Sequence, residues 1–151
     1  MVACGNEQSF GNDYTRTFTA VMDITTGKVI LALSQIWGVP ARHGDVPNAY
    51  VKASTEPDFK IYLHAPQAMK ASEEETLRLG VEHAEQVVIQ LKRSLNGLKQ
   101  TGRLWFQLLH SELLRVGFVQ CVADSCLYFK ANGNVVGVHV DDLLATATAT
   151  S

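Results

Sequence analysis

The sequence predicts a single α+β domain, or part of one, and three observations lead to this prediction. Apolar residues recur at helical spacing in two stretches, 25–37 and 100–116. Near the end of the chain, 135–140 and 143–148 instead alternate between apolar and other residues, as half-buried strands do. A length of 151 residues with 46% hydrophobic content supplies material for one modest core.

The first helix is expected over 25–37. Thr25 or Thr26 can cap its start, and Gly38 and Pro40 end it. Its apolar residues, which recur at helical spacing, are Val29, Ile30, Leu33, Ile36 and Trp37. This pattern indicates an amphipathic helix that packs one side against a core.

Two strands are expected next. The first is short, ends at Asp45, and bends through Pro47 and Asn48. The second lies within 57–66, where apolar and polar residues alternate. The stretch 70–90 breaks this pattern, because its five glutamates outweigh two basic residues, and it is expected to be an exposed helical insertion.

The second helix, 100–116, has the clearest apolar face of the chain and ends at Gly117. Its apolar residues are Leu104, Trp105, Leu108, Leu109, Leu113 and Val116. Trp105 is expected in the core rather than as a platform for base stacking. Lys99 and Arg103 lie four positions apart on one side, where they form either a solvated cationic flank or a contact for phosphate.

Composition excludes several classes of protein. The formal net charge of −2 gives no global basic field, so contacts with nucleic acid must come from a local patch, for which the cation-rich stretch 91–130 is the candidate. Three cysteines without paired spacing argue against a disulfide framework or a zinc site and are expected to be buried thiols. No apolar run approaches the roughly 20 residues that span a bilayer, and no signal peptide is evident, so an intracellular protein without membrane contact is expected.

An acidic pair, Asp141 and Asp142, separates the two alternating runs near the end of the chain. Adjacent carboxylates repel each other and are poor strand formers. A divalent cation would relieve that repulsion, whereas the simpler reading is that aspartate is a common turn residue. A metal site needs a second acid from elsewhere, and Asp45 is the candidate.

Several spaced motifs, in the same order along nearly the whole chain, closely resemble the reverse transcriptase domain of Ty1/copia-type retrotransposons. They are D-Y-T-R-T-F (13–18), G-D-V-P-N-A-Y-V (44–51), S-L-N-G-L-K-Q-T-G-R-L-W (94–105), D-S-C-L-Y (124–128) and V-H-V-D-D-L-L (138–144). The resemblance implies an RNA-directed DNA polymerase that transfers nucleotides to a primer 3′-hydroxyl with two magnesium ions, for which manganese can substitute.

The resemblance also implies roles for individual residues. Asp45 and Asp141 match the two principal metal ligands, and Asp142 matches the adjoining acid. The nucleotide would lie against the loop from Val46 through Asn48 and Ala49, on Tyr50, whose bulk excludes a 2′-hydroxyl, and near Gln67. Template and primer would contact Lys99, Arg103 and His139, the last of which replaces an aromatic residue near the primer end. Two further departures from the family pattern are Asn96 and Ala68.

By the same resemblance, the fold is part of a right-hand polymerase. Fingers-like segments cover 1–40 and 53–90, and a truncated, ferredoxin-like palm covers 41–52 and 91–151, while the thumb and RNase H domain are expected to be absent. Implied partners are an RNA or DNA template-primer, deoxynucleotides and the remaining polyprotein with its RNase H and integrase, within a cytoplasmic particle.

The isolated chain is expected to be weakly active or inactive. Two alternatives stay open. A non-catalytic nucleic-acid-binding relic of the same fold would bind RNA in a salt-sensitive way that is indifferent to loss of Asp141. A different metal-dependent phosphotransferase or nuclease would cleave nucleic acid without incorporating nucleotides.

Overall fold

The computed structural model describes residues 2–64, 72–83 and 86–148, and its centre is a five-stranded antiparallel sheet. The strand order is β1-β7-β6-β5-β4, and the strands are β1 (Arg42–Asp45), β4 (Val119–Gln120), β5 (Leu127–Phe129), β6 (Val135–His139) and β7 (Asp142–Thr146). A second, two-stranded antiparallel sheet pairs β2 (Tyr62–His64) with β3 (Val88–Gln90). The predicted α+β class is confirmed.

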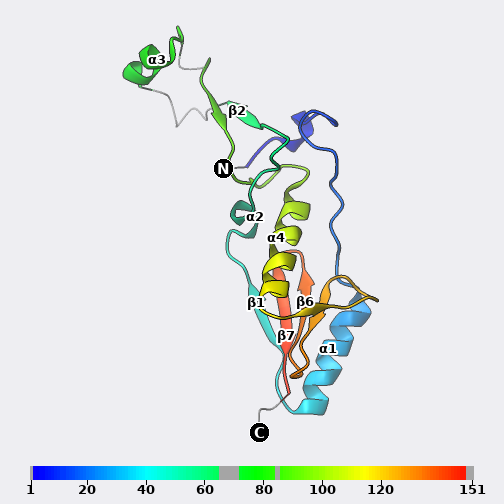
Figure 1. Ribbon diagram of the computed structural model, residues 1–151. Helices are drawn as coiled ribbons and strands as arrows, with labels where there is room; N and C mark the ends of the chain where they lie inside the picture. The colour runs from blue at the N-terminus through cyan, green and yellow to red at the C-terminus, as the bar shows by residue number, and fades with distance from the viewer. Residues whose placement is uncertain (1, 65–71, 84–85, 149–151) are drawn as a thin grey trace.

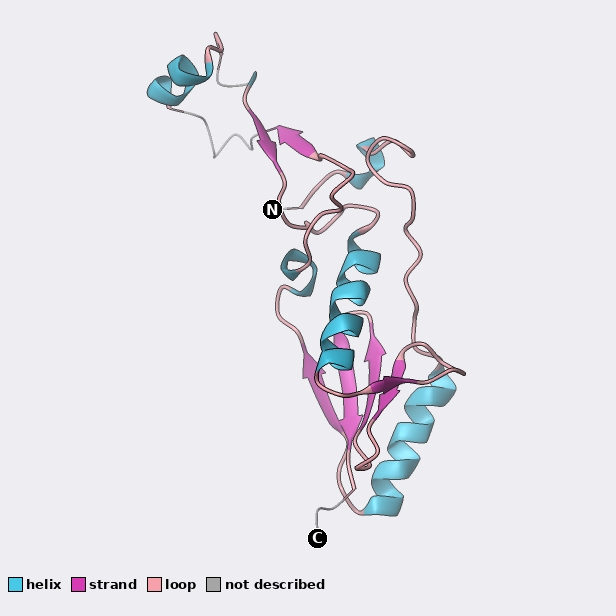
Figure 2. Cartoon of the chain, in the orientation of Figure 1, coloured by secondary structure: helices cyan, strands magenta, loops and turns pink. Residues whose placement is uncertain are grey.

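The helices occupy three levels along the molecule (Figure 1). Alongside the sheet lie α1 (Ile24–Trp37) and the C-terminal half of α4 (Thr101–Arg115), and α2 (Ala49–Lys52) lies beside α4. Beyond the N-terminal end of α4 come a short 3-10 turn (Gly5–Glu7), the β2–β3 sheet and α3 (Glu73–Leu79), as Figure 2 shows. Among the described residues, no helix is long and apolar enough to cross a membrane.

The helix α1 forms where it is predicted, but its cap and part of its face differ. Asp23 caps it by accepting a hydrogen bond from the Thr25 amide at 2.7 Å, so neither predicted threonine is the cap. Ile30 is fully buried, whereas Val29 and Ile36 are exposed. A spacing pattern cannot distinguish these positions, because the apolar residues of α1 extend around more of the helix than the sheet covers.

The two long helices cover opposite faces of the five-stranded sheet. A Cβ on Gly137 of β6 would lie 2.7 Å from Ile30 Cδ1, so this position faces α1. Val138 points to the other face because strand side chains alternate, and it joins a buried cluster with Leu113 of α4 and Tyr128 of β5. Gly137 thus allows α1 to approach the sheet closely.

Asp124, in the D-S-C-L-Y motif, ties the start of α1 to the loop before β5. Its carboxylate accepts hydrogen bonds from the Thr26 hydroxyl at 2.5 Å, the Cys126 amide at 2.8 Å and the Asp23 amide at 3.2 Å. Burial alone would raise the pKa of Asp124, but these bonds outweigh it and hold the pKa below its ordinary value. The motif therefore has a structural role here.

The predicted buried thiols are confirmed only for Cys126. It is fully buried, and burial raises its pKa to about 11. Cys121 is half-buried and Cys4 is exposed. Cys126 behaves as a small apolar core residue, since a thiol with a raised pKa is a poor nucleophile and metal ligand.

The expected exposed helical insertion over 70–90 is confirmed for α3, but it is wrong for Val88–Gln90, which form strand β3 and pair with β2. Ser72 and Glu75 form a capping box at the start of α3, and no side chain of this helix is buried. Three glutamates in the first turn favour the helix, because they interact well with its positive end.

A second core cluster holds the N-terminal segment against the loop before α4. It consists of Ala3, Ile61, Leu95 and Leu98. The Ala3 amide donates to the Asn96 carbonyl at 2.7 Å, and the next residue, Gly97, has a φ of +97°. A Cβ on Gly97 would lie only 2.1 Å from the Ala3 carbonyl oxygen, so the two segments cross where no side chain fits.

We expect Gly97→Ala to lower the free energy of unfolding by well over the about 1–2 kcal/mol that a left-handed conformation alone costs. The matched control is Gly11→Ala. Gly11 also has a positive φ, of +87°, but it has open space around its Cβ position. Urea denaturation followed by circular dichroism measures both changes, and equal losses for the two variants would contradict the proposed crossing.

Candidate functional site

The acidic pair lies at the hairpin that joins β6 to β7. His139 pairs with Asp142, which leaves Val140 and Asp141 as a two-residue turn. Val140 has a φ of +60° and Asp141 does not have a positive φ, which is the pattern of a type II′ turn, where glycine is favoured at the first position. A β-branched residue there costs on the order of 1–3 kcal/mol and persists only where its surroundings hold it.

Two hydrogen bonds from different parts of the chain hold this turn. The indole Nε1 of Trp105, on α4, donates to the Val140 carbonyl at 2.8 Å. The Val46 amide, just after β1, donates to the Asp141 carbonyl at 3.2 Å. Both carbonyls of the turn are therefore occupied by donors from elements that are distant in sequence.

The sheet register brings Asp45 to the same place. Asp45 is directly opposite Asp142 in the β1–β7 pair, so the two side chains share a face, and opposed Cβ atoms lie about 5 Å apart. His43 joins them, with its Nε2 atom 2.9 Å from Asp142 Oδ1, and both side chains are largely open to solvent. Only Asp141 of the pair is a turn residue, because Asp142 begins β7.

These carboxylates suit a hard cation, although they do not form a complete cage. Among the described residues, no three His, Cys, Asp or Glu side chains gather closely enough to hold a metal by themselves. Magnesium is often held by one or two carboxylates together with substrate phosphates, so a closed set of protein ligands is not required. The chemistry of the donors therefore fits a magnesium site that substrate completes.

The loop after β1 also contacts the turn, through the Val46 amide. Asn48 has a left-handed backbone, with φ 55° and ψ 37°, which asparagine tolerates better than most residues, and it precedes α2. The Ala49 amide donates to the Val46 carbonyl at 3.1 Å, so the Val46 and Ala49 amides both already have protein acceptors. The predicted nucleotide residues Val46, Asn48 and Ala49 thus form one ordered bend beside Asp141.

The pKa of the Tyr50 hydroxyl indicates that this bend lies near the acidic turn. Burial, and then the negative charge of Asp141, raise the pKa of the Tyr50 hydroxyl. The phenol is thus within electrostatic range of the turn. Gln67 and Ala68, which belong to the same predicted site, lie outside the described residues.

The three predicted nucleic-acid contacts differ in their surroundings. His139 is exposed at the end of β6, next to the turn. Lys99 is exposed, with its Nζ atom 3.2 Å from the Tyr14 hydroxyl and 5.0 Å from the centre of that ring. Arg103 instead faces inward, with a side chain that is only 13% exposed.

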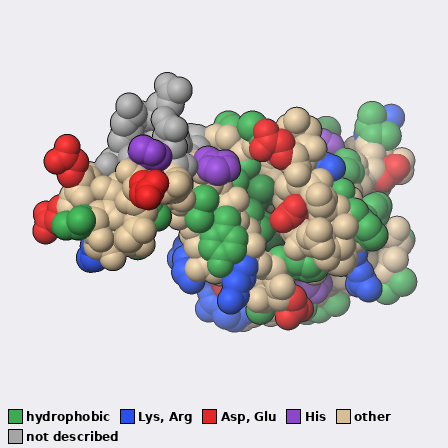
Figure 3. All heavy atoms as spheres, turned by 90° about the horizontal axis from the view of Figure 1, so that it is seen from above, with side chains coloured by type: hydrophobic (Ala, Val, Ile, Leu, Met, Phe, Trp, Pro, Cys, Tyr) green, Lys and Arg blue, Asp and Glu red, His purple; other side chains and the backbone are tan. Residues whose placement is uncertain are grey.

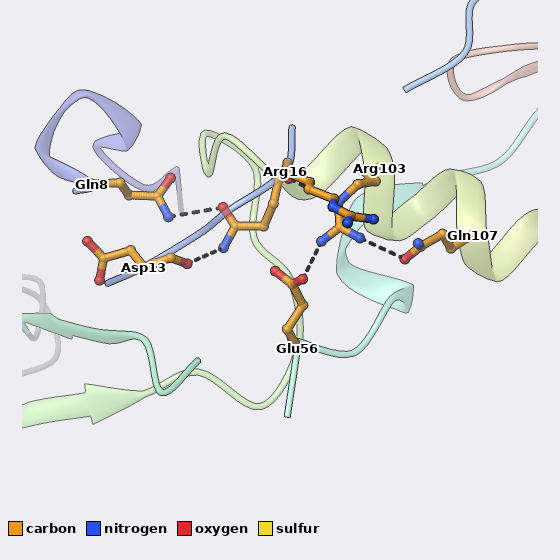
Figure 4. A network of polar contacts seen from close by, with 7 residues as sticks. Gln8, Asp13, Arg16, Glu56, Arg103 and Gln107 are labelled. Atoms are coloured by element: carbon orange, nitrogen blue, oxygen red, sulfur yellow. Dashed lines mark hydrogen bonds and ion pairs between the residues drawn. The ribbon is translucent and has the colours of Figure 1, made fainter. Parts of the chain in front are cut away.

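Arg103 ties three segments together, as Figure 4 shows. Its Nε donates to the Arg16 carbonyl at 3.0 Å, one Nη donates to Gln107, and the other pairs closely with Glu56. The guanidinium is committed to protein acceptors, so it does not form the solvated flank that its spacing allowed. Helical spacing could not reveal this, because all but one of its partners come from outside α4.

A buried glutamine extends the same network. The Gln100 side chain accepts from Gln8 Nε2 at 3.0 Å and donates to the Asp13 carbonyl at 3.1 Å. Sequence reasoning did not single out Gln100, Trp105 as a hydrogen-bond donor, or His43. Their common signal is their place within or beside the motifs 44–51 and 94–105.

Charge is unevenly distributed over the surface. Figure 3, which views the molecule from above, shows acidic side chains at the end that carries α3 and at several other places, while lysine and arginine side chains gather below the middle of the view. Exposed cations near α2 and the start of α4 include Lys52, Lys92, Arg93 and Lys99. The basic stretch is thus spatially separate from the acidic insertion.

Comparison with known proteins gives one consistent result. The family model described as "Reverse transcriptase (RNA-dependent DNA polymerase)" matches residues 1–151. The chain is 31% identical over 149 residues to the "Retrovirus-related Pol polyprotein from transposon RE1" of Arabidopsis thaliana, with 97% of this chain and 9% of that protein covered. No solved structure shows a significant match.

Two further relatives have similar names. The chain is 29% identical over 153 residues to the Pol polyprotein from transposon RE2 of Arabidopsis thaliana, with 99% of this chain and 10% of the relative covered. It is 28% identical over 148 residues to that from transposon TNT 1-94 of Nicotiana tabacum, with 95% and 10% covered. The chain therefore spans about a tenth of the length of these relatives.

We expect Asp141→Asn to lower the pKa of Tyr50, because the change removes a negative charge that disfavours the phenolate. Burial keeps the pKa above its ordinary value in the variant. Titration of ¹³C-labelled tyrosine by NMR measures the shift. The control is Asp58→Asn, at an exposed acid whose side chain makes no hydrogen bond to the described residues. An unchanged Tyr50 in Asp141→Asn would contradict the proximity of the bend and the turn.

Proposed function

The chain belongs to the reverse transcriptase (RNA-dependent DNA polymerase) family, and we propose that it carries the nucleotidyl-transfer site of such a polymerase. The observation that carries the proposal is the register that sets Asp45 opposite Asp142, with Asp141 in the adjoining turn. It sets the acids that the family motifs single out along the edge of the sheet where the β6–β7 turn lies. The proposed parent is a copia-type Pol polyprotein, as the names of the relatives suggest.

In this proposal the five-stranded sheet is the palm of a right-hand polymerase. Segments 41–52 and 91–151 supply its strands and α4, and 53–90 forms part of the fingers. The sequence assigns 1–40 to the fingers as well, but α1 packs against β6 and β7. The proposal therefore groups α1 with the palm-like sheet and leaves the rest of 1–40 to the fingers.

Asp45, Asp141 and Asp142 would hold two divalent ions, magnesium or manganese. When bound, such ions stabilise the attacking and leaving oxygens of the transfer. The chain's other residues bind and orient. The bend through Val46, Asn48 and Ala49 lies beside the nucleotide, Tyr50 sits under its sugar, and Gln67 is assigned to the same pocket from the family resemblance.

The template-primer would approach the same edge. His139 and Lys99 are exposed and can contact it directly, whereas Arg103 acts by ordering the start of α4 unless its ion pair opens. Phosphate contacts by lysine make binding fall with salt concentration. The implied partners are therefore a template-primer, deoxynucleotides and the other parts of the polyprotein.

We expect magnesium- or manganese-dependent extension of a DNA primer on an RNA template, at a low rate, by the 151-residue chain. Asp45→Asn and Asp141→Asn should each reduce it by about a hundredfold or more, since even a partner that only orients a metal ligand contributes about 10- to 100-fold. Gel-resolved single-nucleotide incorporation measures the rate.

The matched control for primer extension is Asp58→Asn, which removes an equal charge away from the hairpin. Extension that survives both Asp45→Asn and Asp141→Asn would exclude the proposed metal site. Salt-sensitive RNA binding without any extension, unchanged in Asp141→Asn, would favour a non-catalytic nucleic-acid-binding chain.

We expect Tyr50→Ala to weaken discrimination against ribonucleotides by about ten- to a hundredfold, because the ring would no longer exclude a 2′-hydroxyl by bulk. Tyr50→Phe keeps the ring and should keep the discrimination. The ratio of kcat/KM for a deoxynucleotide to that for the matching ribonucleotide measures the effect. A ratio that falls equally in both variants would show that the hydroxyl of Tyr50, and not its bulk, sets the preference.

A further inference from the structure

We infer that Trp105 is a positioning residue for the acidic turn: its indole N–H holds the Val140 peptide and thereby sets where the Asp141 carboxylate lies. This inference rests on the proposed function, because the carboxylate matters there as a metal ligand. Trp105 is not a catalytic residue, since its indole N–H binds a backbone carbonyl of the turn and not a reacting group.

The donor is buried and specific. Trp105 is 4% exposed, and its Nε1 lies 2.8 Å from the Val140 carbonyl oxygen. An indole can only donate, through one N–H, so within the core this group requires an acceptor. The acceptor is a turn carbonyl one residue before Asp141, and no apolar side chain of similar size can replace that bond.

The helix that carries Trp105 is itself fixed. One turn before the indole, Gln100 and Thr101 are buried. The Thr101 hydroxyl donates to the Leu95 carbonyl at 2.8 Å and is hydrogen-bonded to the Ser94 hydroxyl at 2.9 Å. Arg103 binds the Arg16 carbonyl and Glu56. The N–H is therefore presented to the turn from a rigid base.

The turn depends on hydrogen bonds from other elements to keep its conformation. Val140 has a left-handed φ that valine adopts poorly, and relaxation of this φ, by rotation about the Val140 N–Cα bond, would move the Val140 carbonyl and the Asp141 residue that follows it. The Val46 amide holds the following carbonyl, that of Asp141. With one anchor on each carbonyl the Asp141 residue is fixed at both ends, and loss of the indole bond frees one of them.

The test removes the N–H and nothing else. Trp37 is the other of the two tryptophans, and the structure records no hydrogen bond from its indole to the described residues. In the Trp37→Phe chain, 3-benzothienyl-alanine incorporated at the remaining tryptophan position replaces N–H with sulfur and keeps a bicyclic ring. The comparison is this protein against the Trp37→Phe chain with ordinary tryptophan.

Manganese affinity, measured by paramagnetic relaxation of water, is the readout that a purely structural role would not move. We expect it to fall by about two- to tenfold on loss of the N–H, which is what one neutral hydrogen bond is worth. Asp141→Asn should abolish this binding. Far-UV circular dichroism of the two proteins should be the same.

A second comparison tests whether the strained φ of Val140 is the reason that the turn needs this hydrogen bond. Val140→Gly allows the positive φ without strain, so in that background we expect the loss of the N–H to change manganese affinity less. Equal manganese affinity with and without the N–H in the parent chain would overturn the inference while leaving the metal site intact. A penalty as large in Val140→Gly would also overturn it.

The proposed function fails in a different way. Absence of manganese binding in the Trp37→Phe chain even with a template-primer and a deoxynucleotide present, or binding that survives Asp141→Asn, would remove the metal site and this inference with it. The two failures are therefore distinguishable within one set of titrations.

Discussion

Two hydrogen bonds to the Val140–Asp141 turn connect the elements that form the proposed metal and nucleotide site. The Val140 carbonyl accepts from Trp105 of α4, and the Asp141 carbonyl accepts from Val46 after β1. The first bond connects the acids to a helix braced by the N-terminal segment, and the second connects them to the bend before Tyr50. The turn therefore keeps a backbone conformation that valine disfavours, because α4 and the bend after β1 both hydrogen-bond to it.

Much of this arrangement could be predicted from sequence, for identifiable reasons. The two long helices and the β6–β7 hairpin have strong periodicity, and periodicity reports which residues a regular element buries. The place of Asp45 at the end of a short strand makes it a candidate acid, and the family motifs match it to a metal ligand. Nothing local indicates which distant strand an acidic hairpin will pair with. The structure supplies that pairing directly.

The errors of prediction have a common physical origin. Asp23 rather than a threonine caps α1. The Thr26 hydroxyl instead donates to Asp124, from a loop about a hundred positions away. Arg103 is drawn inward by Glu56 and by the Arg16 carbonyl, which no helical wheel includes. Hydrogen bonds and ion pairs between distant parts of the chain decide where the Thr26 and Arg103 side chains lie. A single sequence does not indicate which distant residues these side chains will bind.

The pairing of β1 with β7 also determines when the five-stranded sheet can form during synthesis of the chain. Arg42–Asp45 occupies one edge of the sheet, and its only strand neighbour among the described residues is Asp142–Thr146. On the ribosome, β1 would therefore emerge before the strand it needs, and it would stay unpaired until about a hundred further residues had been made. Such late, non-local closure favours slow folding and exposes the nascent chain to aggregation.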